Sequence, residues 1–102
     1  MADKLEKEFE ADLRRLVSSY GGMCLKWTCP GWIGVPDRLV HLPGGRVLFV
    51  ELKQPGGGRI GAMQLWWRRR LIDLGMDHFF LRSEEDLHAL EYLIRYGGGD
   101  HD

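Results

Sequence analysis

The chain has 102 residues, of which 44% are hydrophobic and 28% charged, and its formal net charge is −1. This length favours a single domain with one modest core, and the near-zero charge excludes a globally basic nucleic-acid binder. No apolar run approaches the ~20 residues that span a bilayer. The charged start of the chain does not resemble a secretory signal, so we expect a cytoplasmic protein.

The first predicted element is an amphipathic helix over Leu5–Tyr20, where apolar residues recur at intervals of three and four. The pair Gly21-Gly22 ends this helix in the manner of a C-cap. A short strand over Met23–Thr28 follows. The segment Cys29–Pro36 is predicted to be a loop, because two prolines and two glycines interrupt it.

A β-hairpin is predicted next, with strands at Asp37–Leu42 and Arg46–Lys53 joined at Pro43-Gly44-Gly45. The second strand is apolar on both faces, which indicates a central strand covered on both sides. Polar residues at the end of such a strand are conspicuous, because open α/β sheets place their ligand crevices there.

The second half of the chain predicts a helix, a strand and a last helix. After a glycine-rich loop at 54–61, a helix runs over Ala62–Leu74, followed by a strand over His78–Arg82 and a helix capped by Ser83. The predicted apolar stripe of the middle helix consists of Met63, Trp67, Leu71 and Leu74. We expect residues 1–96 to form one α/β domain with the element order αβββαβα, and residues 97–102 to form a disordered tail.

Asp37 and Glu51 are the most informative pair, because each lies seven residues from Gly44. If the chain turns there, the two carboxylates face each other on neighbouring strands, and Lys53 lies on the same face. Like charges in this position destabilise a sheet unless something offsets them, and a divalent cation is the usual offset. We therefore predict a Mg²⁺ or Mn²⁺ site held by both carboxylates, with the Leu52 carbonyl as a further ligand.

This arrangement suits phosphodiester hydrolysis. The cation would polarise the phosphate and lower the pKa of an attacking water. Lys53 would orient that water or stabilise the developing charge. Glu6 and Glu10 share one face of the first helix, so either could complete the metal shell or simply be solvated. Gln64 either reaches towards Lys53 or remains a surface residue.

The segment from Leu52 to Ile72 contains five cations and no acid. A basic face on a neutral protein suits contact with DNA phosphates, although a solvated arginine run is the plain alternative. The candidate DNA-binding residues are Arg38, Arg59, Arg68 and Arg69.

Four tryptophans are many for a chain of this length, and a core or a subunit interface explains them better than base stacking does. The two cysteines, Cys24 and Cys29, have no further cysteine with which to build a zinc site. We expect both to be reduced thiols.

These motifs together resemble a known family. The residues that carry the resemblance are Gly34-Val35-Pro36-Asp37-Arg38, Gly44-Gly45-Arg46, Phe49-Val50-Glu51-Leu52-Lys53 and Gln64. In this order they are similar to the VRR-NUC (viral replication and repair nuclease) domain of the PD-(D/E)XK nuclease superfamily, and the likeness runs from about Glu6 to the third helix. It implies a restriction-endonuclease-like core, a mixed sheet flanked by helices, and hydrolysis that depends on Mg²⁺ or Mn²⁺.

The resemblance also implies residue roles. Asp37 and Glu51 would be metal ligands, Lys53 the catalytic lysine and Gln64 a further active-site residue. A glutamate of the first helix would be an accessory ligand, for which Glu10 is favoured and Glu6 is held in reserve.

Stand-alone chains of this size are similar to phage-encoded repair enzymes that cut branched DNA as homodimers. The resemblance thus implies a structure-selective DNA endonuclease, active in the host cytoplasm, that resolves four-way (Holliday) junctions by attack of a metal-activated water. A two-fold dimer supplies the two opposed sites that a junction requires. Trp32, Trp66 and Trp67 are the candidate interface residues. The alternatives are a nuclease acting on other branched or linear DNA, and a catalytically silent DNA-binding accessory with the same fold.

Overall fold

The computed structural model describes residues 6–53 and 59–97. Its elements are α1 (Glu6–Ser19), β1 (Met23–Lys26), β2 (Arg38–Leu42), β3 (Arg46–Leu52), α2 (Ala62–Asp73), β4 (Asp77–Leu81) and α3 (Glu84–Tyr96). This order confirms the predicted αβββαβα arrangement, with boundaries that differ by at most two residues within the described ranges. The predicted start of the first helix at Leu5, most of the glycine-rich loop (54–58) and most of the tail (98–102) lie outside the described residues.

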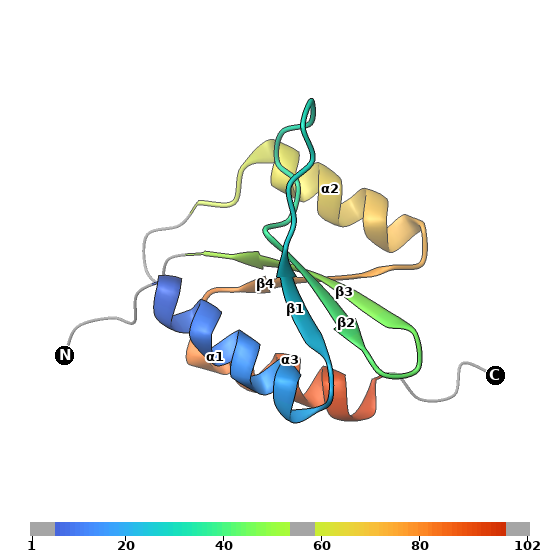
Figure 1. Cartoon of the computed structure of the whole chain (residues 1–102). Coiled ribbons are helices and arrows are strands. Elements are labelled where there is room, and N and C mark those ends of the chain that lie inside the picture. Colours follow the sequence, from blue (N-terminus) through green and yellow to red (C-terminus); the bar gives the residue numbers. More distant parts are fainter. Residues whose placement is uncertain (1–5, 54–58, 98–102) are drawn as a thin grey trace.

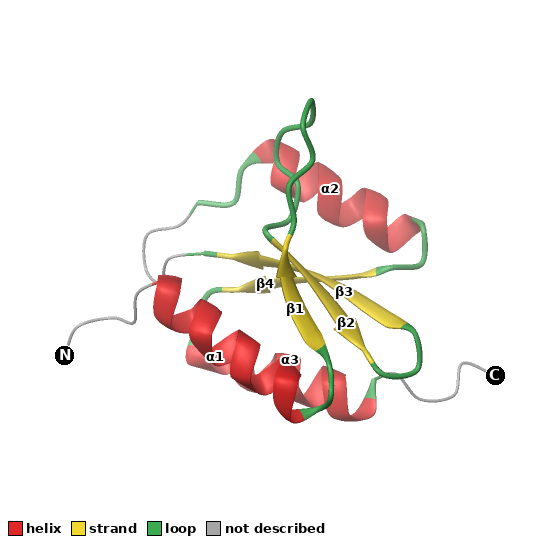
Figure 2. Cartoon of the chain, viewed as in Figure 1, coloured by secondary structure: helices red, strands yellow, loops and turns green. Residues whose placement is uncertain are grey.

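The sheet is four-stranded and mixed, in the order β1-β2-β3-β4. Strands β1, β2 and β3 are antiparallel neighbours, whereas β3 and β4 run parallel because α2 provides the crossover between them. Strand β3 is therefore an inner strand, as its apolar pattern predicts. Helix α2 covers one face of the sheet, and α1 and α3 lie on the other (Figures 1 and 2).

The core lies between the sheet and the α1/α3 layer. Alternate residues of β2 and β3, among them Val40, Leu48 and Val50, are fully buried there. They pack against Phe9 and Leu13 of α1 and against residues of α3. The other face of β3, which carries Phe49 and Glu51, lies on the α2 side of the sheet.

Helix α2 departs from its predicted apolar stripe. Leu71 is buried, but Leu74 is 58% exposed and sits past the last helical residue. Leu74 ends the helix, since its backbone N–H donates to the Arg70 carbonyl. In the part of the chain that the structure describes, no helix is both long and apolar enough to cross a bilayer.

Candidate active site

The β2–β3 hairpin brings Asp37 and Glu51 together. Gly44 and Gly45 both adopt positive φ in the three-residue connection, which a side chain would disfavour. The strand register pairs Arg38 with Val50. Continued by one residue, this register sets Asp37 directly opposite Glu51, as the spacing about Gly44 predicts.

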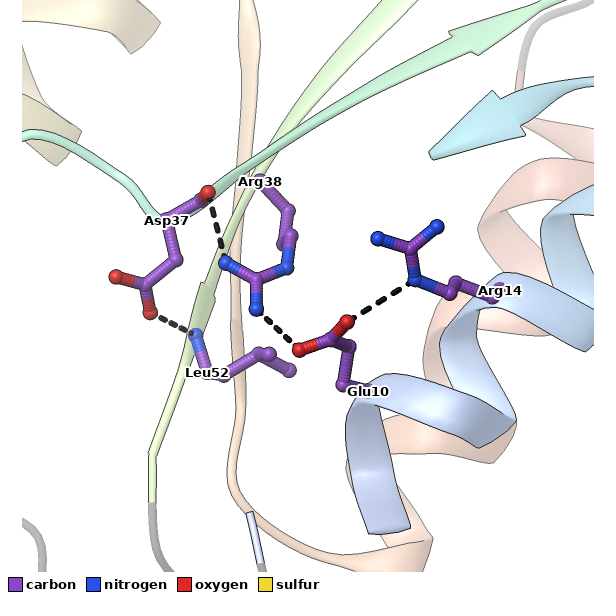
Figure 3. Close-up of polar contacts among 5 residues, drawn as sticks. All are labelled: Glu10, Arg14, Asp37, Arg38 and Leu52. Atoms are coloured by element: carbon purple, nitrogen blue, oxygen red, sulfur yellow. Dashed lines mark hydrogen bonds and ion pairs between the residues drawn. The ribbon is translucent and has the colours of Figure 1, made fainter. Parts of the chain in front are cut away.

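The Asp37 side chain is held by β3 itself. Its Oδ2 atom accepts a hydrogen bond from the Leu52 backbone N–H at 3.0 Å (Figure 3). The N–H and C=O of one residue point to the same side of a strand. The Leu52 carbonyl therefore also points towards the Asp37 side, which is where the predicted backbone ligand has to be.

Glu51 is a buried acid with an unusual environment. It is only 3% exposed, and its Oε2 atom is fully buried without a hydrogen-bond partner among the described residues. Burial raises the pKa of Glu51 to about 9, and a hydrogen bond with Asp37 and the charge of Asp37 add to the rise. Lys53 acts in the opposite direction. At neutral pH the pair is therefore expected to share a proton unless a cation replaces it.

The pair fits a divalent cation. The unpartnered Glu51 oxygen, the Asp37 carboxylate and the Leu52 carbonyl are hard oxygen donors of the kind that Mg²⁺ and Mn²⁺ prefer. In residues 6–53 and 59–97, no group of three or more His, Cys, Asp or Glu side chains is close enough to hold a metal ion. The protein side of such a site therefore consists of two carboxylates plus backbone, and leaves positions for water and phosphate.

Lys53 lies one step past β3, on the same face as Glu51. Its backbone N–H donates to the Leu81 carbonyl at 3.0 Å, and its Nζ donates to the Arg59 carbonyl, also at 3.0 Å. An ammonium has three donors, and the contact with Arg59 uses one of them. Gln64 contributes differently: its Oε1 accepts the Gly61 backbone N–H at 2.9 Å and so caps the first turn of α2.

The two glutamates of α1 occupy different environments. The carboxylate of Glu10 binds Arg38 through one oxygen and Arg14 through the other, and these two hydrogen bonds, Arg38 first, lower its pKa. The charge of Glu6 makes the smallest contribution to the raised pKa of Glu51.

The predicted DNA-binding arginines separate into two groups. Arg59 and Arg69 are exposed. Arg68 is half-buried: its Nη1 donates to the His78 carbonyl at 2.7 Å, and its guanidinium lies 5.6 Å from the Phe80 ring centroid. Arg38 is 8% exposed, a position that does not suit the predicted contact with DNA. Strand alternation was the available signal, because Arg38 shares its face with Val40 and Leu42, which are core residues.

The tryptophans form one cluster between the 27–36 loop and α2. Trp67 donates its Nε1–H to the Ile33 carbonyl at 2.9 Å and contacts Trp27, Trp32 and Trp66 edge-on. Trp32 and Trp66 stack with their ring centroids 6.3 Å apart, yet they remain 55% and 45% exposed. The cluster thus fastens the loop that ends at Asp37 onto α2 and still presents two rings to solvent. Both cysteines are free thiols, as predicted.

Comparison with known proteins agrees with this geometry. No family model matches the chain. The chain is 40% identical over 83 residues to a protein of Acyrthosiphon pisum secondary endosymbiont phage 1 that carries the name "Putative nuclease p44", a match that covers 81% of this chain and 84% of the phage protein. A solved structure described as a VRR_NUC domain is similar with a TM-score of 0.76 and 27% identity, over 89% of this chain and 95% of that one. The chain therefore belongs to the VRR-NUC family of nucleases.

Proposed function

We propose that this protein is a Mg²⁺- or Mn²⁺-dependent endonuclease that hydrolyses DNA phosphodiester bonds at the Asp37–Glu51 site. The observation that carries the proposal is the buried carboxylate of Glu51, which faces a second carboxylate and has an unpartnered oxygen. A folded protein gains nothing in stability from such a pair. Cation binding explains the pair, because a bound cation polarises a phosphate and lowers the pKa of an attacking water.

In this proposal each residue has a separate task. Asp37, Glu51 and the Leu52 carbonyl hold the cation. Lys53 directs its ammonium at the attacking water or at the charge that develops on the phosphate. For the accessory acid we propose Glu6 in place of Glu10, because Glu10 binds Arg38 and Arg14 whereas the charge of Glu6 acts on Glu51. Glu6 would act through water, since among the described residues no third acid groups with the pair. Gln64 supports the site indirectly, by fixing the start of α2.

Branched DNA, and four-way junctions in particular, is the substrate that we propose. One chain of this size has one site, and a junction requires two opposed cuts, so a two-fold dimer is the simplest arrangement that provides both. The exposed Arg59 would contact the DNA backbone, whereas Arg69 lines a groove of α2 together with Leu65 and Ile72.

The test is a cleavage assay that offers junctions, flaps, forks and linear duplex of matched sequence, with Mg²⁺, Mn²⁺ or EDTA. We expect cleavage only with a metal and the fastest cleavage for the junction. Equal cleavage rates on the junction and on linear duplex would contradict the junction preference but not the nuclease activity. Metal-independent cleavage, or no cleavage of any substrate, would contradict the proposed activity.

The homodimer is supported by an exposed apolar surface on α2, which we call the α2 apolar face. It consists of Leu65, Trp66 and Ile72, together with Trp32 of the adjoining loop, each between 45% and 55% exposed. Leu65 and Ile72 also line a shallow groove of about 260 Å³, whose other lining residues are Arg68, Arg69 and Asp73. Contiguous exposed apolar surface is a mark of protein–protein interaction sites.

We expect Leu65→Arg to dissociate the dimer, because it places a third guanidinium beside Arg68 and Arg69 in the groove that the interface would bury. Light scattering should give about twice the 11.8 kDa chain mass for the parent protein and the single-chain mass for the variant. Tyr92→Arg, at an exposed position of α3, is the control and should remain dimeric. A monomeric parent protein at micromolar concentration, or dissociation by the control alone, would contradict an interface at the α2 apolar face.

A further inference from the structure

Arg38 connects helix α1 to the backbone of Asp37. Its Nη2 binds a carboxylate oxygen of Glu10, and its Nη1 donates to the Asp37 carbonyl at 3.0 Å (Figure 3). The same carbonyl accepts the Trp27 backbone N–H at 2.8 Å. The peptide that carries Asp37 is therefore held from two directions, while the Asp37 carboxylate is held by Leu52.

The position of Arg38 explains how it reaches this peptide. Strand alternation turns the Arg38 side chain to the α1 side of the sheet, and the Asp37 carboxylate to the α2 side. The guanidinium thus contacts the Asp37 main chain from the face of the sheet opposite to the two carboxylates. Glu10 in turn is kept in place by Arg14, whose Nε donates to it at 3.0 Å.

Stability alone is a poor explanation of this arrangement. Arg38 is 8% exposed, and its Nε atom is buried without a partner among the described residues. Only Arg38 is buried in this ion pair, and burying a guanidinium costs desolvation energy that offsets the attraction to Glu10. An unpaired buried N–H group destabilises further. The fork geometry of a guanidinium does, however, fix two acceptors relative to each other.

We propose that Arg38, oriented by Glu10, is a positioning residue that holds Asp37 in the geometry in which its carboxylate faces Glu51. This inference rests on the proposed function, since it assigns the pair a role in metal binding at that site. Arg38 would then affect metal affinity and turnover through Asp37, without touching the DNA. Residues that orient metal ligands typically change metal affinity or activity by about 10–100-fold when they are replaced.

The experiment compares Arg38→Gln, Arg38→Lys, Glu10→Gln and the double variant Glu10→Gln/Arg38→Gln. Three quantities are measured: hydrogen exchange of the Leu52 amide in metal-free protein, the Kd for Mn²⁺ by calorimetry, and kcat and KM for junction cleavage. The control is Arg15→Gln, which removes an exposed ion pair with Asp12 from the same helix.

For Arg38→Gln we expect about tenfold faster exchange of the Leu52 amide, because the Asp37 carboxylate no longer stays on it, and about tenfold weaker Mn²⁺ binding. The kcat value should fall while KM for DNA stays unchanged. Arg38→Lys should recover part of the loss, because an ammonium can reach one of the two acceptors. The double variant should have the same amide exchange rate, Mn²⁺ affinity and kcat as Arg38→Gln, since Glu10 acts through Arg38. The control should match the parent protein.

Different results separate the inference from the proposed function. A parent protein that binds no Mn²⁺ would contradict the metal site, whereas an unchanged Leu52 amide in Arg38→Gln would contradict the positioning role by itself. A raised KM with unchanged Mn²⁺ affinity would make Arg38 a DNA contact. Should Arg38→Gln fail to fold, Glu10→Gln carries the test, because it leaves the guanidinium in place; unchanged exchange and Mn²⁺ affinity in that variant would overturn the inference.

Discussion

Glu51→Gln is expected to abolish cleavage and, at the same time, to make the metal-free protein more stable. Activity should fall because the amide replaces a charged metal ligand by a neutral one. Stability should rise because burial and Asp37 force the Glu51 carboxyl to take up a proton when the protein folds, which costs free energy above its ordinary pKa. The amide of glutamine has the same shape and does not titrate. If Glu51 were present to stabilise the fold, Glu51→Gln would instead lower the free energy of unfolding of the metal-free protein.

The gain in stability should depend on pH in a defined direction. The pKa of Glu51 is about 9 in the folded protein, against 4.5 as its ordinary value. The folded state therefore binds more protons than the unfolded state across this window, so the free energy of unfolding of the parent protein falls as pH rises from 4.5 to 9. The slope approaches about 1.4 kcal/mol per pH unit in the middle of this window, so the parent protein loses stability steadily between pH 5 and pH 8.

Urea unfolding in EDTA at pH 5, 6, 7 and 8 measures this directly. The difference between Glu51→Gln and the parent protein should be small at pH 5 and grow with each pH unit. Asp77→Asn, at an exposed position where β4 begins, is the matched control and should show no such trend. If the variant were instead less stable than the parent protein at pH 8, this would contradict the conclusion that the Asp37–Glu51 pair destabilises the metal-free protein.

Lys53→Ala is expected to separate catalysis from metal binding. Loss of a donor directed at developing charge typically lowers turnover by about 100–1,000-fold, whereas the oxygen ligands of the cation are untouched. Asp37→Asn should instead lose both cleavage and Mn²⁺ binding. Single-turnover cleavage of a junction and calorimetric titration with Mn²⁺, performed on both variants, test this contrast.

Lys26→Ala is the control for Lys53→Ala, because Lys26 is an exposed lysine on the edge strand β1. It should retain the parent rate. Near-normal cleavage by Lys53→Ala would remove Lys53 from the chemistry. Loss of Mn²⁺ binding in Lys53→Ala would make it a structural residue, whose hydrogen bond to the Arg59 carbonyl shapes the site.

The amino-acid sequence determined the element order and the β2–β3 hairpin. Local signals decided these features: helical spacing in α1, strand alternation in β2, and two glycines that alone tolerate the backbone of the turn. A turn fixes the register of its two strands, so the approach of residues 37 and 51 followed from counting along the chain. The cap of α3 was equally local, since the Ser83 hydroxyl accepts the Asp86 N–H at 3.1 Å.

Only the tertiary structure decided what surrounds these residues. Four positions in the sequence separate Glu6 from Glu10, and periodicity places both on one face of α1. The docking angle of α1 on the sheet decides that Glu10 meets Arg38 while Glu6 acts on Glu51. The burial of Glu51, which sets its pKa, likewise arises from contacts between elements distant in the chain. Local sequence encodes backbone geometry, but solvent exclusion and ion pairing across layers depend on how the finished layers pack.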